Sequence, residues 1–392
     1  MRRVTATAGG LLLLAATVLL PATASPSLAA APTSPPVVAP ACPDRPADWP
    51  TEPPVLAHFY IWFTERSWDR AKQDFPAAGR YSSDDLAVVK KQVAQAQSAG
   101  IDGFIVSWKS TAALDSRLRQ LRNVADSSGF KLAITYQAQD FYRQPLSVAQ
   151  VRHDLQLLAT TYAADPVFHL FGSRPVVALS GTWNYTAEEL RSIVEPVASK
   201  LMVLATEKSV EDYQRVSSTV DGDLYYWSSA DPLQTPGYQS KLVDMANAVR
   251  TRCGLWIAPV APGFDARDVG GRTVVDRRHG DTLRSSWQAA LASSPDAIGV
   301  ISWNEFSENT YIEPSEQYGA AYLDEIDALT KAPPPPAKEL DSSASDGQGA
   351  APLFPPMLTA AATAIGIFLI ATVWGMSRRR RAGHPQGTRR AQ

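Results

Sequence analysis

The stretch Ala297-Ile298-Gly299-Val300-Ile301-Ser302-Trp303-Asn304-Glu305 indicates the fold more clearly than any other part of the chain. Its first five residues are apolar and partly β-branched, which predicts a short buried strand. The strand ends directly in polar and aromatic residues. In a parallel barrel the carboxyl ends of all strands meet at one face, where functional residues gather. The stretch therefore predicts a barrel strand that delivers polar side chains to a site.

The same alternation of strand-like and helix-like segments extends outward from Val55 to Lys331. Eight repeats in about 280 residues have the length and rhythm of a (β/α)8 TIM barrel, an α/β fold. A doubly wound open sheet shows the same alternation, so the periodicity leaves it open. The eight strand candidates are Leu56–Trp62, Gly103–Trp108, Leu132–Gln137, Val176–Ser180, Met202–Thr206, Asp223–Trp227, Leu255–Val260 and Ile298–Trp303.

Local signals between the strands predict how helices begin. The segment Asp84–Ser98 has apolar residues at helical spacing, and Ser82 or Ser83 is expected to cap it. The segment Thr186–Glu189 has the pattern of a capping box. Asp102, which precedes a strand, is interpreted as a structural turn or cap acid.

The N-terminal residues predict export. Residues 1–30 carry a basic start, an apolar run and then small residues, which is the pattern of a signal peptide. The run is too short for a membrane helix and ends at Pro21. The Pro- and Ala-rich residues 31–54 are expected to form a linker before a single folded domain at 55–331.

The C-terminal residues predict a membrane anchor. Residues 332–356 form a Pro/Ser-rich stem, and residues 357–376 are apolar, uncharged and long enough to cross a bilayer. Residues 377–392 are basic, which places them in the cytoplasm and disfavours a GPI signal. The sequence thus predicts a single-pass type I protein at the cell membrane with its folded domain outside.

Composition limits the partners. The net charge of −2 gives no reason to invoke nucleic acid, and no Cys/His cluster or phosphate-binding glycine loop suggests a metal or an organic cofactor. The two cysteines, Cys42 and Cys253, are compatible with a disulfide or with two free thiols, and the sequence leaves both open. It does not indicate an oligomeric state.

The carboxylates that follow the last strand point to a reaction class. Glu305, Glu308 and Glu313 lie close together in the sequence among aromatic residues. Glycoside hydrolysis uses two carboxyl groups, one of which protonates the leaving oxygen while the other acts on the sugar itself. The chain is therefore interpreted as a carbohydrate-active enzyme.

Aromatic and amide side chains at other strand ends fit a saccharide cleft, because rings stack on sugar C–H faces while amides bind hydroxyl groups. The candidate substrate-binding residues are Tyr60, Trp62, Trp108, Tyr136, Gln137, Tyr226, Trp227, Asn304 and Glu313. For Glu313, a loop acid or a helix-start partner is an equally good interpretation.

The segment Asn304–Pro314 resembles the N-E-W-x-E-G-T-x-I-E-P signature of the family 99 glycoside hydrolases, the endo-α-mannosidase group. The family 71 α-1,3-glucanases are a more distant match. Supporting blocks occur in the family's order at Ala99–Trp108, Gly79–Asp84, Ala261–Asp265 and Arg278–Thr282.

The resemblance implies roles for two acids. Glu305 would act as the base on the sugar 2-hydroxyl and Glu308 as the acid/base at the glycosidic oxygen, with net retention through a 1,2-anhydro sugar. Phe306 replaces the usual Trp, Ser307 stands where His is common, and Asn309 replaces Gly. Asn tolerates positive φ, so the turn is expected to survive, while the mannose specificity is left open.

Three functions remain in view. The first is a surface-anchored endo-α-glycosidase acting on α-mannan or mannose-containing glycans. The second is an α-glucanase that uses the same acid pair as nucleophile and acid/base. The third, from a different class, is a non-catalytic glycan-binding surface protein.

Overall fold

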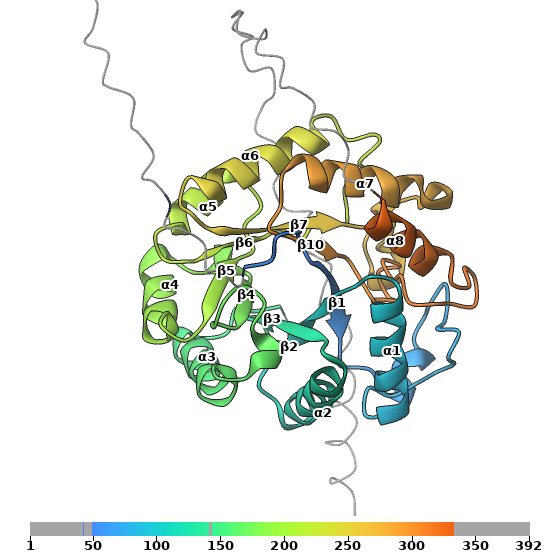
Figure 1. The fold of residues 1–392 in the computed structure, drawn as a ribbon, viewed down its shortest axis with the longest axis horizontal. Coiled ribbons are helices and arrows are strands. Elements are labelled where there is room, and N and C mark those ends of the chain that lie inside the picture. The colour runs from blue at the N-terminus through green and yellow to red at the C-terminus, as the bar shows by residue number, and fades with distance from the viewer. Residues whose placement is uncertain (1–41, 43–48, 141–142, 333–392) are drawn as a thin grey trace, which may run out of the picture. The chain divides into compact units, whose positions relative to one another are not determined.

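A computed structural model describes Cys42, residues 49–140 and residues 143–332 of the chain. Eight parallel strands close into a barrel in the order β1-β10-β7-β6-β5-β4-β3-β2 (Figure 1), which confirms the (β/α)8 prediction and excludes the open sheet. The strands are β1 Val55–Tyr60, β2 Gly103–Trp108, β3 Lys131–Gln137, β4 Val176–Ser180, β5 Met202–Ala205, β6 Gly222–Leu224, β7 Leu255–Val260 and β10 Ala297–Val300.

Helices surround the barrel, and short elements decorate the loops (Figure 1). The α-helices are α1 Leu86–Ser98, α2 Ala112–Ser128, α3 Val148–Tyr162, α4 Ala187–Val194, α5 Val210–Val216, α6 Tyr238–Arg250, α7 Asp281–Ala292 and α8 Ala321–Lys331. The 3-10 helices are η1 Glu65–Asp69, η2 Pro166–Phe168, η3 Thr182–Asn184, η4 Glu195–Val197, η5 Arg267–Val269 and η6 Arg278–Gly280. A small antiparallel ribbon pairs β8 Phe264–Asp265 with β9 Val274–Val275.

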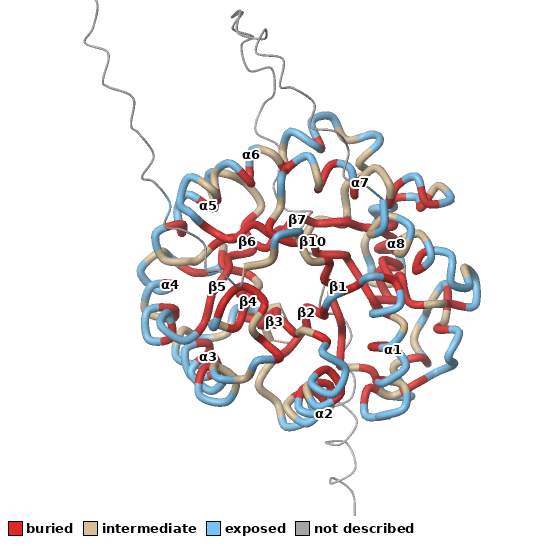
Figure 2. Tube along the Cα trace, viewed as in Figure 1, coloured by how far each residue is buried: buried red, intermediate tan, exposed pale blue. Residues whose placement is uncertain are grey.

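Side chains alternate strictly between the two faces of the barrel wall, as the pleat of a strand requires. On β2, Phe104 and Val106 belong to the large core between the wall and the helices, whereas Ile105 belongs to the separate core inside the barrel. Figure 2 shows the consequence: the strands are buried, and exposed residues lie on the outer sides of the helices.

The helix starts agree with the sequence in one case and differ in another. The capping box at Thr186 is confirmed, since Glu189 N donates to Thr186 Oγ1 at 3.2 Å and Thr186 N donates to Glu189 Oε2 at 2.9 Å. The prediction that Ser82 or Ser83 caps α1 is wrong. Asp85 is the cap, because its Oδ1 accepts a hydrogen bond from Ala87 N at 2.8 Å. A carboxylate is also favoured there by the helix dipole.

Asp102 has the structural role that was predicted. Its Oδ2 accepts a hydrogen bond from Val55 N at 2.8 Å, at the amino-terminal end of the barrel. Two further acids that precede strands repeat the bond: Asp221 accepts from Val203 N at 2.9 Å and Asp296 from Trp256 N at 2.8 Å. These acids satisfy strand-end N–H groups that would otherwise lack a partner.

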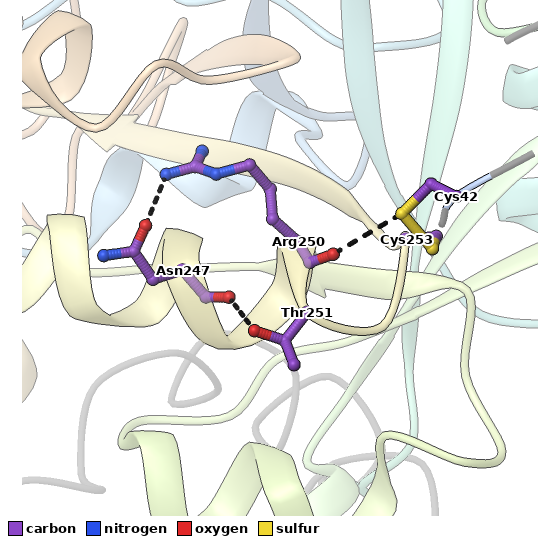
Figure 3. The surroundings of a disulfide bond; sticks show 5 residues. All are labelled: Cys42, Asn247, Arg250, Thr251 and Cys253. Carbon is purple, nitrogen blue, oxygen red and sulfur yellow. Dashed lines mark hydrogen bonds between the residues drawn. A yellow bond between two sulfur atoms is a disulfide. The ribbon is translucent and has the colours of Figure 1, made fainter. Parts of the chain in front are cut away.

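Cys42 and Cys253 form a disulfide, which settles the question that the sequence left open (Figure 3). Their Cα atoms are 5.4 Å apart, within the range a disulfide spans. Cys253 lies between α6 and β7, so the bridge ties an N-terminal residue to the end of the barrel at which the strands begin.

Several predictions fall on residues that the structure does not describe. The predicted signal peptide at 1–30, most of the linker at 31–54, most of the stem at 332–356, the spanning segment at 357–376 and the basic tail at 377–392 all lie outside the described residues. Within the described part of the chain, no helix combines the length and the apolar character needed to cross a membrane.

Candidate active site

The loop after β10 folds back on itself and presents its acids at the mouth of the barrel. Ser302 N donates to Thr310 O at 2.8 Å, and Ile312 N donates to Ser302 O at 2.9 Å. Asn309 takes φ = 54°, the left-handed conformation expected of the residue that replaces Gly. The substitution therefore preserves the turn.

Phe306, which replaces the usual Trp, is fully buried. Its ring stacks on Tyr311 with a centroid distance of 4.0 Å and contacts Trp68 edge-on at 5.5 Å. An indole N–H in this apolar cluster would need a polar partner, whereas a phenyl ring does not. The replacement is thus accommodated by packing.

Asn304 connects this loop to the first strand. Its Oδ1 accepts a hydrogen bond from Tyr60 N at 2.9 Å, and its Nδ2 donates to Tyr60 O at 3.0 Å. Nδ2 also donates to the hydroxyl of Tyr81 at 3.2 Å. The Asn304 side chain is fully buried, and both its oxygen and its nitrogen are hydrogen-bonded to other protein groups. Asn304 is therefore placed to position its neighbours.

Glu313 lies in the same buried network. It accepts hydrogen bonds from the Tyr81 hydroxyl at 2.9 Å and from Gln92 Nε2 at 2.7 Å. Burial raises the pKa of Glu313 to about 7, although the two donors partly offset this effect. Glu313 supports Asn304 through Tyr81 and does not line the pocket described below.

Glu305 and Glu308 are both buried, at 3% and 4% exposure. Glu305 Oε1 accepts a hydrogen bond from Ser307 N at 3.0 Å, and the backbone oxygen of Glu308 accepts one from Asp265 N at 2.8 Å. Asp265 belongs to one of the blocks that supported the family resemblance. Asp265 ends strand β8 of the small ribbon, so the ribbon holds the backbone of the second acid of the signature.

The two carboxyl groups have unequal surroundings. Burial raises the pKa of both, but the N–H of Ser307 and the positive charge of Lys72 favour the ionised form of Glu305. The pKa of Glu308 is raised well above its usual range, first by burial and then by the charge of Glu305, with only Arg143 opposing. Glu305 therefore ionises first, and Glu308 keeps its proton.

A pocket of about 170 Å³ opens beside Glu308 at the carboxyl ends of the strands. Tyr60 and Tyr226 both line this pocket, and their hydroxyls are hydrogen-bonded to each other at 2.8 Å. Burial raises the pKa of both phenols, and the charges of Glu305 and Glu308 raise it further. The other lining residues are His58, Ser107, Thr135, Gln137, Gln139, Ser180, Trp183, Thr206, Lys208, Leu224, Ser228, Ser229 and Phe264.

Of the predicted substrate-binding residues, Tyr60, Gln137 and Tyr226 line this pocket, together with the predicted catalytic Glu308. Three other aromatics point outward into the helix layer. Trp108 Nε1 donates to Asp115 on α2 at 3.0 Å, and the Tyr136 hydroxyl donates to Asp154 on α3 at 2.7 Å.

Trp227 is the third of these outward residues. It stacks on Tyr238 of α6 at 4.6 Å, with the Lys241 ammonium 4.7 Å from its ring centre. Trp62 packs against Tyr60 at 4.5 Å and does not line the pocket either. The aromatic residues at the strand ends thus divide between the pocket and the helix layer.

The pocket is also lined by residues that were not predicted from the sequence. On β1, β2 and β3 the inward positions near the carboxyl ends are His58, Ser107 and Thr135. His58 is buried and contacts Tyr226 edge-on, and burial lowers its pKa to about 3, so it is a neutral imidazole. Side chains two positions apart on a strand share a face, so a polar residue two positions after an inward apolar one also points inward. This spacing, seen for Ser107 after Ile105 and Thr135 after Ala133, could have identified these residues from the sequence.

Among residues 49–140 and 143–332 together with Cys42, no group of three or more His, Cys, Asp or Glu side chains is placed to hold a metal ion.

A closed barrel with two buried carboxyl groups after its last strand, of which Glu308 lines the pocket and Glu305 does not, resembles the arrangement of barrel glycoside hydrolases. The chain belongs to the family described as glycosyl hydrolase family 71, which matches residues 71–329. The signature after the last strand resembles family 99 first and family 71 second, and endo-α-mannosidases and an α-1,3-glucanase are both found among the relatives.

Two curated relatives represent the two kinds. The chain is 20% identical over 279 residues to the glycoprotein endo-α-1,2-mannosidase of Rattus norvegicus, covering 64% of this chain and 59% of the relative. It is 23% identical over 287 residues to a glucan endo-1,3-α-glucosidase of Schizosaccharomyces pombe, covering 66% of this chain and 57% of the relative. The chain thus spans less than two thirds of their length.

A solved structure shares the fold. The GH99 endo-α-mannosidase from Bacteroides thetaiotaomicron superimposes with a TM-score of 0.60 at 19% sequence identity, covering 70% of this chain and 95% of that chain. At this identity the similarity establishes the barrel and says nothing of the substrate.

Proposed function

We propose that this protein is a retaining endo-α-glycosidase that acts on α-mannan or on mannose-containing glycans, with Glu305 as base and Glu308 as general acid and base. The observation that carries the proposal is the unequal environment of the two buried acids. Ser307 N–H and Lys72 favour a charged Glu305, while burial and that charge keep Glu308 protonated. Environments that push two pKa values apart are typical of acid/base pairs.

The first half of the reaction uses both groups at once. Glu308 gives its proton to the glycosidic oxygen while Glu305 takes the proton of the sugar 2-hydroxyl. The freed O2 attacks C1, the C1–oxygen bond to the leaving sugar breaks, and a 1,2-anhydro sugar remains. In the second half, Glu308 takes a proton from water, which attacks C1 and opens the three-membered ring. Glu305 returns its proton to O2, and the configuration is retained.

The pocket offers groups that can bind the sugar next to these acids. Tyr60 and Tyr226 present hydroxyls, and Gln137 presents an amide that is held by a hydrogen bond from its Nε2 to Ser107 Oγ at 2.8 Å. Buried polar groups with fixed geometry select substrate hydroxyls by their orientation. Asn304 and Glu313 take part by holding Tyr60 and the acid loop in place.

An α-glucanase is the second candidate, because the chain belongs to family 71 and resembles a glucan endo-1,3-α-glucosidase. In that case one acid would be the nucleophile, and the carboxyl groups of such direct-displacement enzymes lie about 5–5.5 Å apart. A 2-deoxy substrate analogue separates the two routes. It cannot react through the 2-hydroxyl, but it can still react with a carboxylate nucleophile.

We further infer that the predicted signal peptide directs export and that the predicted spanning segment at 357–376 then holds the barrel outside the cell on its Pro-rich stem, close to envelope glycans. Protease treatment of intact cells tests this inference, since an outward barrel would be released and an inward one would be protected.

The test of the activity is a panel of α-mannans, α-glucans and mannose-containing oligosaccharides, incubated with the full chain in detergent, with products identified by mass. Release of oligosaccharides from an α-mannan supports the proposal, and release from an α-1,3-glucan alone supports the second candidate. If the panel is bound but none is cut, the protein is a glycan-binding protein and the proposal fails.

A further inference from the structure

Lys208 and Trp183 line the same pocket as Glu308. Trp183 lies in η3 after β4, and Lys208 follows β5. In the barrel order β5 is four strands from β1 and β4 is four strands from β10, so the strands that lead to Lys208 and Trp183 lie opposite those that lead to Tyr60 and the acid loop (Figure 1). An eight-stranded barrel is about 15 Å wide between opposite strands, given its strand spacing and tilt. Lys208 therefore extends into the pocket from the far side of the mouth, where the next sugar unit of a bound chain can lie beside the one that Glu308 protonates.

The ammonium of Lys208 is held over the indole of Trp183, with Nζ 4.0 Å from the ring centre. Both side chains are half-buried, and the aromatic face fixes a charge that a free lysine would keep in bulk water. Burial lowers the pKa of Lys208, which means that the site carries an incompletely solvated cation.

The neighbouring acids are engaged elsewhere. Glu207 forms an ion pair with Arg215 at 3.0 Å, and Asp212 accepts a hydrogen bond from Ser209 Oγ at 2.6 Å. In the described part of the chain no carboxylate lies within ion-pair distance of Lys208. The charges of Glu207 and Asp212 act on Lys208 from a distance, but neither forms an ion pair with its ammonium.

Side chains with hydroxyl groups line the same pocket as this charge. Four pocket residues near the ends of β4, β5 and β6 carry them: Ser180, Thr206, Ser228 and Ser229. Such side chains can both donate to and accept from sugar hydroxyls. A fixed ammonium beside hydroxyl groups is suited to a sugar that itself carries a negative charge.

We propose that Lys208, positioned by Trp183, forms a subsite for an anionic sugar, one that bears a carboxylate or a phosphate ester, next to the sugar that is cleaved. The inference rests on the proposed glycosidase function and adds a substrate class to it. The anion lies across the mouth from the charge of Glu305, so it is separated from the like charge that would repel it.

The test measures binding and cleavage separately. Binding is measured by calorimetry with the full chain carrying Glu308→Gln, so that no turnover occurs, on matched mannose oligosaccharides that are neutral, uronic-acid-containing or phosphorylated. We expect at least one acidic ligand to bind about tenfold tighter than the neutral one, which is the range of a charge-assisted hydrogen bond. Which acid is preferred distinguishes the carboxylate from the phosphate.

Variants identify the residue responsible. Lys208→Met should abolish the preference by weakening the acidic ligands more than the neutral one. Lys208→Arg should retain part of the preference, and Lys200→Met, at an exposed lysine, should change nothing. Equal binding of all ligands by the parent protein, or equal loss of neutral and acidic binding in Lys208→Met, would overturn the subsite. Cleavage of neutral mannan by the wild type is scored independently, so that a failed subsite is distinguishable from a failed glycosidase.

Discussion

The side-chain amide of Asn304 is hydrogen-bonded to both backbone groups of Tyr60, across 244 residues of sequence. The pairing of β1 with β10 closes the barrel, and these bonds extend the contact between the two strands beyond its last ladder pair, Ala57 with Val300. They also set the position of the Tyr60 hydroxyl relative to Glu305, the residue that follows Asn304. The first and last strands of the chain are therefore joined at the site itself.

Replacing Asn304 by Ala should lower both activity and stability. The change leaves the N–H and C=O of Tyr60 buried without partners, which costs about 1–3 kcal/mol for each group. We expect kcat/KM to fall at least about tenfold and the free energy of unfolding to fall by about 2–4 kcal/mol. Denaturant unfolding and initial rates check this, with the exposed Asn123→Ala as control. Unchanged activity would show that these bonds to Tyr60 do not position the site.

Removing the charge of Lys72 should shift the acid side of the pH–rate profile. The positive charge of Lys72 favours ionised Glu305 and so lowers a pKa that burial raises. Without it the pKa of Glu305 rises further, and the pH below which the base is lost rises too. In the wild type, we expect the acid limb of the kcat/KM profile to lie at a pH above the pKa of an ordinary Glu side chain. In Lys72→Met, we expect this limb to lie at a still higher pH.

The control for that experiment is Lys90→Met on the exposed side of α1, which should leave the profile in place. A shift of the acid limb to lower pH in Lys72→Met would contradict the assignment of Glu305 as the group that must be ionised.

The barrel could be predicted from the sequence because its signal is repeated eight times, so an error in one segment does not change the pattern. The aromatic site residues could not be predicted equally well. Trp108, Tyr136 and Trp227 stand at strand ends, as expected, but on outward positions where they contact α2, α3 and α6. Tyr136 and Gln137 are neighbours on β3 and cannot both face the pocket.

The inward positions become evident only when the register of each strand is known. Ser107 and Thr135 line the pocket, and each stands next to an outward aromatic residue. Residue type alone favours the large aromatic side chains of Trp108 and Tyr136 as sugar-binding residues. The alternation of side chains along each strand instead places the smaller neighbours, Ser107 and Thr135, in the pocket. Partners brought by other elements, such as Lys72 beside Glu305, depend on loop packing that has no local sequence signal.

Arg277 should affect activity although it does not line the pocket. Its Nη2 donates to the backbone oxygens of Asn309 and Tyr311 at 2.9 and 2.8 Å, and its guanidinium lies over the Tyr311 ring at 4.6 Å. Lys cannot reproduce this planar, forked contact. We therefore expect Arg277→Lys to reduce kcat/KM several-fold, and the exposed Arg66→Lys to have no effect. Wild-type rates in Arg277→Lys would show that the acid loop holds its shape without this brace.

The disulfide should contribute stability without affecting catalysis. It closes a loop of 211 residues and lies at the end of the barrel opposite the pocket. Bridges of this kind stabilise by about 2–4 kcal/mol. The double variant Cys42→Ser/Cys253→Ser should unfold at lower denaturant concentration than the wild type while kcat/KM at 25 °C is retained. Equal stability with and without the bridge would contradict this expectation.

The division of labour between Glu305 and Glu308 is tested most directly with two leaving groups. Rates are measured for the wild type, Glu305→Gln and Glu308→Gln on a natural glycan from the panel and on an aryl glycoside of the same sugar. A phenol that leaves readily needs no proton from an acid, but the 2-hydroxyl still needs a base. On the glycan, both variants should react about 10²–10⁴-fold more slowly than the wild type. On the aryl glycoside, Glu308→Gln should recover its first step and Glu305→Gln should not. Recovery of Glu305→Gln instead, or near-wild-type cleavage of the glycan by either variant, would contradict the proposed roles.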